Sequence, residues 1–121
     1  MAFRRQVSPL PLTPVEFEIL LALTEHDLHG YAILRAVQAR VGSELVLRTG
    51  TLYRAITRLG EGGLIDESVD ATAAMTDRRR LVYRLTSRGL DTARREAQRL
   101  AGQVAAARER NLLPSSQPWP S

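Results

Sequence analysis

Residues 49–59, TGTLYRAITRL, are the most informative stretch of the sequence. Their apolar members recur at helical spacing and converge on one side of a helix: Leu52, Ala55, Ile56 and Leu59. The opposite side and its flanks carry small, hydroxylated or cationic residues: Gly50, Tyr53, Arg54, Thr57 and Arg58. Thr49 can cap this helix, and the glycines at 62 and 63 end it. The stretch therefore predicts a helix with one buried face and one face that can bind a partner.

Two further helices are predicted before this one. The segment TPVE at residues 13–16 is a capping box with proline at the first helical position, and it starts a helix that ends near His26. Asp27 caps the second helix, which Gly42 closes. An extended bridge over residues 44–48 then leads to the third helix.

Two short β-rich segments follow, at residues 64–69 and 80–85, with polar residues 70–79 between them. This pattern predicts a hairpin with a long tip. Gly60 lies inside the preceding helix, where glycine costs roughly 1 kcal/mol relative to alanine, so we expect a frayed last turn. Three helices followed by a two-stranded hairpin predict a winged helix-turn-helix, a mainly α fold with a small β-hairpin.

A fourth helix follows the hairpin, beginning at Thr86 or Ser87 and running to about Leu112. Its apolar residues follow steps of three and four and form a heptad seam: Leu90, Ala93, Ala97, Leu100, Val104 and Ala107. One winged-helix domain is too small to cover this seam, so we expect a second copy of the chain to cover it. The resulting domain map is a flexible arm over 1–12, a winged helix-turn-helix over 13–85, a dimerisation helix over 86–112 and a disordered tail over 113–121.

The chain has 121 residues, the size of one domain, and its basic side chains outnumber the acidic ones. All 17 basic residues are arginines, against 13 acids, which gives a formal charge of +4. Such a balance favours an anionic partner, and the arginine fork binds phosphate and guanine edges bidentately. A genome-wide preference for arginine codons is an alternative explanation for the absence of lysine.

The absence of cysteine excludes disulfides, thiolate metal sites and zinc fingers. The longest apolar stretch, residues 17–23, is far shorter than the ~20 residues needed to cross a bilayer. Acids at positions 16 and 18 interrupt any export signal that Arg4 and Arg5 could start. We therefore expect a cytoplasmic protein.

Two surfaces are candidates for contact with double-stranded DNA. The first is the polar face and amino end of the third helix: Thr49, Gly50, Thr51, Tyr53, Arg54, Thr57 and Arg58. A helix in the major groove can bind phosphate with its amino end and read base edges with its side chains. The second is the run Arg78, Arg79 and Arg80 on the wing, which can contact phosphate. The alternatives are a solvated helix face and a solvated turn.

The order and spacing of five segments make the sequence resemble the PadR-like transcriptional regulators, in the short class with a single carboxyl-terminal helix. The segments are LLAL (20–23), LHGYAI (28–33), TGTLYRAITRL (49–59), GGLI (62–65) and RRRLVYRLTSRG (78–89). The resemblance covers residues 13 to about 112. It departs at Thr49, where such proteins often have proline or serine, and at Gly60, which replaces a typical acid.

The resemblance implies a homodimeric repressor whose last helix builds most of the dimer and whose third helix reads an inverted repeat. Some members respond to phenolic or other hydrophobic compounds, so a small hydrophobic or aromatic effector is a candidate partner. The family's motif positions fall on Tyr31, Thr51, Tyr53, Arg54, Arg58 and the arginines before Tyr83. A tyrosine can pack in the core or offer its hydroxyl to a phosphate, and we favour the core for Tyr31 and phosphate for Tyr53.

Other function classes have less support. His26 and His29 stand beside acids, yet no third and fourth ligand follow at a recognisable spacing, so a metal-sensing regulator is a minor alternative. The sequence shows no nucleophile elbow, phosphate loop or paired carboxylates, which predicts that the chain is not an enzyme and needs no cofactor. A winged helix that binds only proteins is the other alternative, and the arginines of the third helix argue against it.

Overall fold

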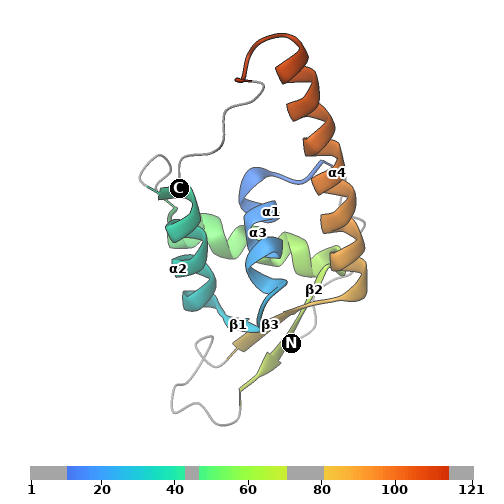
Figure 1. Cartoon of the computed structure of the whole chain (residues 1–121). Coiled ribbons are helices and arrows are strands. Elements are labelled where there is room, and N and C mark those ends of the chain that lie inside the picture. Colours follow the sequence, from blue (N-terminus) through green and yellow to red (C-terminus); the bar gives the residue numbers. More distant parts are fainter. Residues whose placement is uncertain (1–10, 43–46, 71–80, 115–121) are drawn as a thin grey trace.

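The computed structural model describes residues 11–42, 47–70 and 81–114. Their elements follow in the order α1 (Pro14–Leu23), β1 (Leu28–His29), α2 (Gly30–Val41), α3 (Thr49–Glu61), β2 (Ile65–Val69), β3 (Leu81–Leu85) and α4 (Ser87–Glu109). Figure 1 shows α1 in the middle of the molecule, with α2 and α4 on either side and the sheet below them. The fold is a winged helix-turn-helix, mainly helical with one small antiparallel sheet, which confirms the predicted class.

Helix α1 begins where its capping box predicts. The Thr13 side chain accepts the Glu16 N–H at 3.2 Å, and the Glu16 carboxylate accepts the Thr13 N–H at 2.8 Å. These two bonds satisfy donors that the first helical turn leaves without partners. The helix ends at Leu23, before the predicted end near His26, and the Thr24 hydroxyl donates to the Leu21 carbonyl. The early end leaves room for a short strand before α2.

That strand, β1, was not predicted from the sequence. Leu28 pairs with Tyr83 and His29 with Val82, so the backbone here is extended and helix α2 begins only at Gly30. The prediction that Asp27 caps α2 is therefore wrong, because His29 occupies the N-cap position and makes no side-chain capping bond. The predicted end is confirmed, since Gly42 follows the helix with φ of +66°.

Helix α3 begins at Thr49, so Arg48 rather than Thr49 stands at the N-cap. The helix closes with a Schellman motif: Leu64 N–H donates to the Leu59 carbonyl at 2.9 Å and Gly63 N–H to the Gly60 carbonyl at 3.0 Å. Gly63 adopts φ of +76°, which this motif requires and glycine adopts without strain. Gly60 is buried, and the helix continues through it to Glu61, so the fraying expected of the last turn stays a prediction.

The sheet has the strand order β1-β3-β2, and both pairings are antiparallel. Strands β2 and β3 form the wing, in a register that places Ile65 opposite Leu85 and Val69 opposite Leu81. The predicted hairpin is confirmed, although its first strand begins at Ile65, one position later than expected. The wing tip, residues 71–80, lies outside the described residues, and so do residues 43–46 of the bridge before α3.

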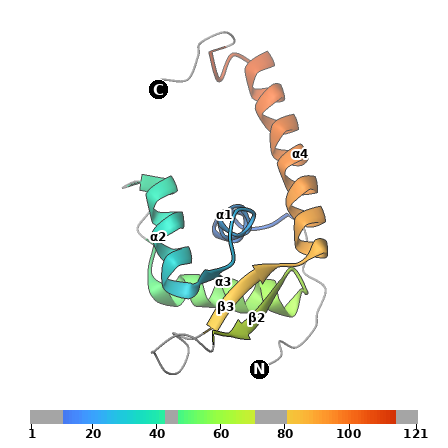
Figure 2. The same ribbon diagram turned by 60° about the horizontal axis from the view of Figure 1, so that its bottom comes forward.

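The hydrophobic core lies where α1 meets α2, α3 and α4. Figure 2 looks along α1 and shows it between α2 and α4, with α3 and the sheet below it. The core members with no exposed surface come from four elements, α1, α2, α3 and β2: Ile19, Leu20, Ile33, Val37, Leu52, Ala55, Leu59 and Ile65. Leu12, the last residue of the expected arm, is also buried in this cluster.

Helix α4 has two different halves. Thr86 caps it by accepting the Gly89 N–H at 2.9 Å and donates its own hydroxyl to the Gly63 carbonyl at 2.8 Å, which ties the helix start to the end of α3. The first half packs on the protomer through Gly89, Thr92, Ala93 and Glu96. The second half projects beyond the body of the molecule and ends at Glu109, earlier than the predicted Leu112.

Candidate nucleic-acid interface

Helix α3 divides into a buried face and an exposed face, as the sequence predicts. Its apolar side contributes Leu52, Ala55, Ile56 and Leu59 to the core, none more than 2% exposed. The other side is open to solvent at Thr49, Gly50, Arg54, Thr57 and Arg58, while Thr51 and Tyr53 are half-buried. The core thus fixes α3 in place and leaves its cationic face available to a partner.

Arg54 lies over the amino-terminal turn of α3. Its Nη1 atom would contact a Cβ placed on Gly50 at 3.4 Å, so the guanidinium lies close to the Gly50 backbone. Its Nη2 atom is 3.5 Å from the Thr51 hydroxyl oxygen, near the outer limit of a hydrogen bond. A guanidinium at the amino end of a helix adds its charge to the free backbone N–H groups there, and this combination suits an anion.

Arg58 is bound to a buried carboxylate of α1. Its Nε donates to Glu16 Oε2 at 2.8 Å, while the Arg58 side chain remains 50% exposed and that of Glu16 only 9%. The sequence indicated Glu16 only as a capping residue. Nothing in the sequence identifies this ion pair, since its members stand 42 positions apart.

Thr57 and Tyr53 are partly engaged inside the protein. The Thr57 hydroxyl donates to the Tyr53 carbonyl at 2.9 Å, so that its oxygen can still accept a bond. The Tyr53 hydroxyl lies against Gly30, where a Cβ would collide with it. Tyr53 therefore joins α3 to the first residue of α2, and the phosphate contact expected of it stays a prediction.

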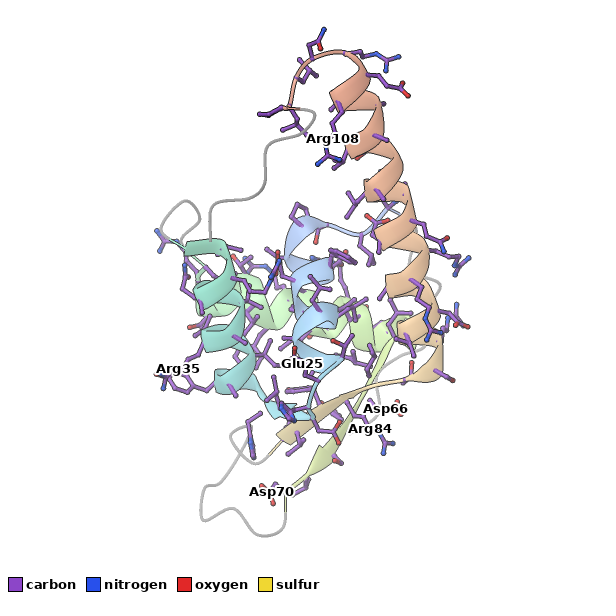
Figure 3. All side chains as sticks on the ribbon, viewed as in Figure 1. Glu25, Arg35, Asp66, Asp70, Arg84 and Arg108 are labelled. Atoms are coloured by element: carbon purple, nitrogen blue, oxygen red, sulfur yellow. The ribbon has the colours of Figure 1, made fainter. Side chains whose placement is uncertain are left out.

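Tyr31 is on the surface, so the prediction that it packs in the core is wrong. Its side chain is 67% exposed, and the Arg35 guanidinium lies 5.9 Å from the centre of its ring. Figure 3 shows Arg35 pointing outward from α2. The helical repeat places residue 31 on the side of α2 opposite Ile33, which is buried, and that spacing could have predicted the exposure.

A hollow separates α3 from the wing. It has a volume of about 640 Å³ and is lined by Gly50, Tyr53, Arg54, Ile56, Thr57, Arg58, Glu67, Leu81 and Tyr83. Its floor includes the buried Ile56 and Tyr83, and its rim carries both arginines of α3.

The predicted wing contacts Arg78, Arg79 and Arg80 lie outside the described residues. On the described part of the wing, Arg84 and Asp66 lie beside each other, 3.9 Å apart (Figure 3).

The histidines do not form a metal cluster with the other described residues. His26 is exposed, and His29 Nε2 lies 3.1 Å from Asp70 Oδ2 at the end of β2. Within residues 11–42, 47–70 and 81–114, no three His, Asp or Glu side chains converge as metal ligands would.

None of the helices in the described part of the chain is both long and apolar enough to cross a membrane.

The predicted dimerisation seam on α4 is divided between the two halves of the helix. Ala93 is 6% exposed and belongs to the protomer's own core, so it is not available to a second chain. Leu90, Leu100 and Ala107 are half-buried, whereas Ala97 is exposed and Val104 is 40% exposed. The apolar residues of the projecting half are thus the ones that remain for a partner.

Comparisons with known proteins agree with this architecture. Residues 19–95 match the family described as the transcriptional regulator PadR-like family. A PadR family transcription regulator from Clostridium difficile is 27% identical with a TM-score of 0.66, and the match covers 80% of this chain and 97% of that one. A transcriptional regulator from Clostridium thermocellum is 25% identical with a TM-score of 0.67, covering 78% and 87%.

A PadR-like transcriptional regulator from Bacillus cereus, at 20% identity and a TM-score of 0.66 over 84% of this chain and 93% of that one, shares the fold. No curated protein matches the chain significantly. The family match spans more than half of the sequence and includes α2, α3, the wing and the start of α4. The chain therefore belongs to the PadR-like family of transcriptional regulators.

Proposed function

We propose that the chain is a sequence-specific regulator that binds double-stranded DNA as a homodimer, with α3 in the major groove and the wing along the backbone. The one-sided burial of α3 carries this proposal, because four apolar side chains anchor the helix while its arginines stay in solvent. A winged helix that binds only proteins needs no such cationic face. Membership of a transcriptional-regulator family supports the same conclusion.

The exposed residues of α3 have different roles in this proposal. Arg54 makes a bidentate contact to a base edge, since its fork lies on the outer face of the helix. Thr49, Gly50 and Thr51 bring the helix amino end close to phosphate. Tyr31 and Arg35, exposed together on α2, contact the DNA backbone in this proposal. The wing arginines add contacts that are independent of sequence.

The projecting half of α4 supplies the dimer in this proposal. Leu100, Val104 and Ala107 follow helical spacing on a segment that extends beyond the protomer's own body (Figure 1). A second copy packed there by two-fold symmetry would cover the same residues on both chains. The two α3 helices would then stand about 34 Å apart, or a multiple of that, on an inverted repeat.

We also propose that the regulator represses transcription in the cytoplasm and responds to a small hydrophobic or aromatic effector. This part rests on the resemblance of its motifs to the short class of the family. A reporter fused to the chain's own upstream region tests repression, since deletion of the gene should raise expression. Screening aromatic compounds for release of the DNA tests the effector.

Arg54→Ala tests the DNA-reading role directly. We expect operator affinity to fall by ~1–3 kcal/mol, the value of one bidentate base contact, with a relaxed preference at one base position. Arg94→Ala is the matched control, because Arg94 is an exposed arginine of α4 that lies outside α3 and the wing. Genome-wide footprinting supplies the operator, and anisotropy titrations at several salt concentrations give both affinities. Equal affinities for the two variants on a folded protein would contradict the proposal.

A further inference from the structure

Glu16 is a buried carboxylate whose two oxygens serve different helices. Oε1 accepts the Thr13 N–H at 2.8 Å and completes the capping box of α1. Oε2 accepts from Nε of Arg58, on α3, also at 2.8 Å. A capping box needs only one carboxylate oxygen, so the start of α1 does not explain the second bond.

The bond orients the Arg58 side chain. A guanidinium is planar with its donors in a fixed fork, so a bond at Nε sets the plane of the group and the direction of its two terminal nitrogens. Arg58 is half exposed and lines the hollow between α3 and the wing, on the side where the proposed DNA lies. Arg54 is held less firmly, by a 3.5 Å contact to Thr51.

We propose that Glu16 is a positioning residue that acts through Arg58 and raises the discrimination between operator and non-specific DNA. The proposal rests on the DNA-binding function proposed above. A guanidinium that is already held in one plane loses less conformational entropy when it makes a bidentate contact to a base. This lower cost favours binding to the operator, where such a contact forms. Glu16 also offsets one positive charge beside α3, which weakens the attraction to phosphate that is independent of sequence.

Glu16→Gln is the first test. Glutamine keeps an oxygen for the Thr13 N–H but loses the charge that holds Arg58. We expect operator affinity to fall roughly tenfold, within the range of one base contact. Affinity for a scrambled duplex should stay the same or rise. The slope of log affinity against log salt concentration for that duplex should steepen by up to about one unit. A merely structural Glu16 would instead lower both affinities together with the melting temperature.

The neighbouring ion pair of α1 provides a matched control. Glu18 Oε1 accepts from Nε of Arg40, on α2, at 2.7 Å. Glu18→Gln therefore makes the same change in net charge on the same helix and breaks the same kind of bond, without a link to α3. We expect its ratio of operator to scrambled affinity to equal that of the wild type. If Glu16→Gln and Glu18→Gln lower this ratio equally, the proposal is wrong.

Arg58→Lys separates orientation from charge and leaves the capping box intact. Lysine keeps the positive charge but has no planar fork. Operator affinity should fall about as much as in Glu16→Gln, within roughly tenfold, while scrambled affinity stays at the wild-type value. If Arg58→Lys keeps the wild-type ratio of operator to scrambled affinity, the proposal is wrong. Arg54→Ala distinguishes a failure of this proposal from a failure of the proposed DNA-binding function. If Arg54→Ala lowers operator affinity while the Glu16 and Arg58 variants do not, only the role of Glu16 fails.

Discussion

Helices α3 and α4 both carry an apolar stripe, but the protomer itself buries only one of them completely. In α3, Leu52 and Leu59 have no exposed surface, whereas the stripe of α4 includes both Ala93, which is 6% exposed, and Val104, which is 40% exposed. Figure 2 shows the reason, because α3 lies across the body of the molecule while α4 extends away from it. An apolar stripe therefore predicts that a helix face must be covered. The tertiary arrangement decides whether the same protomer or a second copy of the chain covers it.

The largest effect should come from a charge in the projecting half of α4. Leu100→Glu would place one carboxylate on each side of the proposed two-fold axis, in a seam where unpaired charges are costly. We expect the dimer dissociation constant to rise roughly 100-fold or more, with a similar loss of operator affinity. Light scattering at micromolar concentration measures the first and anisotropy the second.

Gln98→Glu is the control for that variant. Residue 98 is exposed on the side of α4 away from the seam, so the same charge should leave the dimer intact there. A dimeric Leu100→Glu variant would refute the proposed seam. So would a monomeric wild type that still binds an inverted repeat tightly.

The stripe of α3 can be tested by removing one of its fully buried side chains. Leu59→Ala leaves a cavity between α3 and the rest of the core, and we expect the free energy of unfolding to fall by about 2–5 kcal/mol. Leu112→Ala makes the same chemical change at a residue that is 72% exposed, and it should change stability by less than about 0.5 kcal/mol. Urea denaturation compares the two. Similar losses would mean that α3 does not anchor the core.

The sequence predicts local features better than long-range ones. The capping box at Thr13 and Glu16 and the helix end at Gly42 each lie within a few neighbouring residues, and the structure confirms them. Strand β1 was missed because its extended shape comes from pairing with Tyr83, far along the chain. The cap assigned to Asp27 failed for the same reason.

The candidate site was predictable in outline. Helical spacing alone separates the buried and exposed faces of α3, and the structure has the same division. The same spacing places Tyr31 on the surface, and it is a better guide here than the tendency of aromatic side chains to be buried. The bond between Glu16 and Arg58 was beyond sequence reasoning, because neither residue type nor spacing distinguishes it from other pairs of opposite charge.

Two glycines of α4 test whether its halves differ in packing. A methyl group at Gly89 would collide with the Leu64 carbonyl oxygen and the Leu85 side chain, so Gly89→Ala should destabilise by about 1–3 kcal/mol. A methyl group at Gly102 would meet nothing within 4 Å outside the helix's own nearby backbone, and Gly102→Ala should stabilise by roughly 0.5–1 kcal/mol through helix propensity. Thermal unfolding measures both. Destabilisation by Gly102→Ala would mean that the projecting half is already covered on that side.

The smallest effect should be the pH dependence that Glu96 gives to the packed half of α4. Arg99 holds the pKa of Glu96 below its ordinary value of 4.5, chiefly by hydrogen bonds of 2.9 and 2.6 Å, against the opposing effect of burial. A lowered pKa means that the ionised form stabilises the fold above the ordinary pKa. This contribution is lost as the pH falls through the pKa of the folded state.

Glu96→Gln should therefore be less stable than the wild type at neutral pH, and the difference should shrink as the solution is acidified below about pH 4.5. Asp91→Asn is the control on the same helix, because Asp91 is 73% exposed and its contact with Arg94 is 3.7 Å long. That variant should follow the wild-type pH profile closely, since exposed ion pairs contribute little to stability. Denaturation curves measured from neutral to acidic pH make the comparison. A constant difference between Glu96→Gln and the wild type at every pH would show that Glu96 acts through packing rather than through its charge.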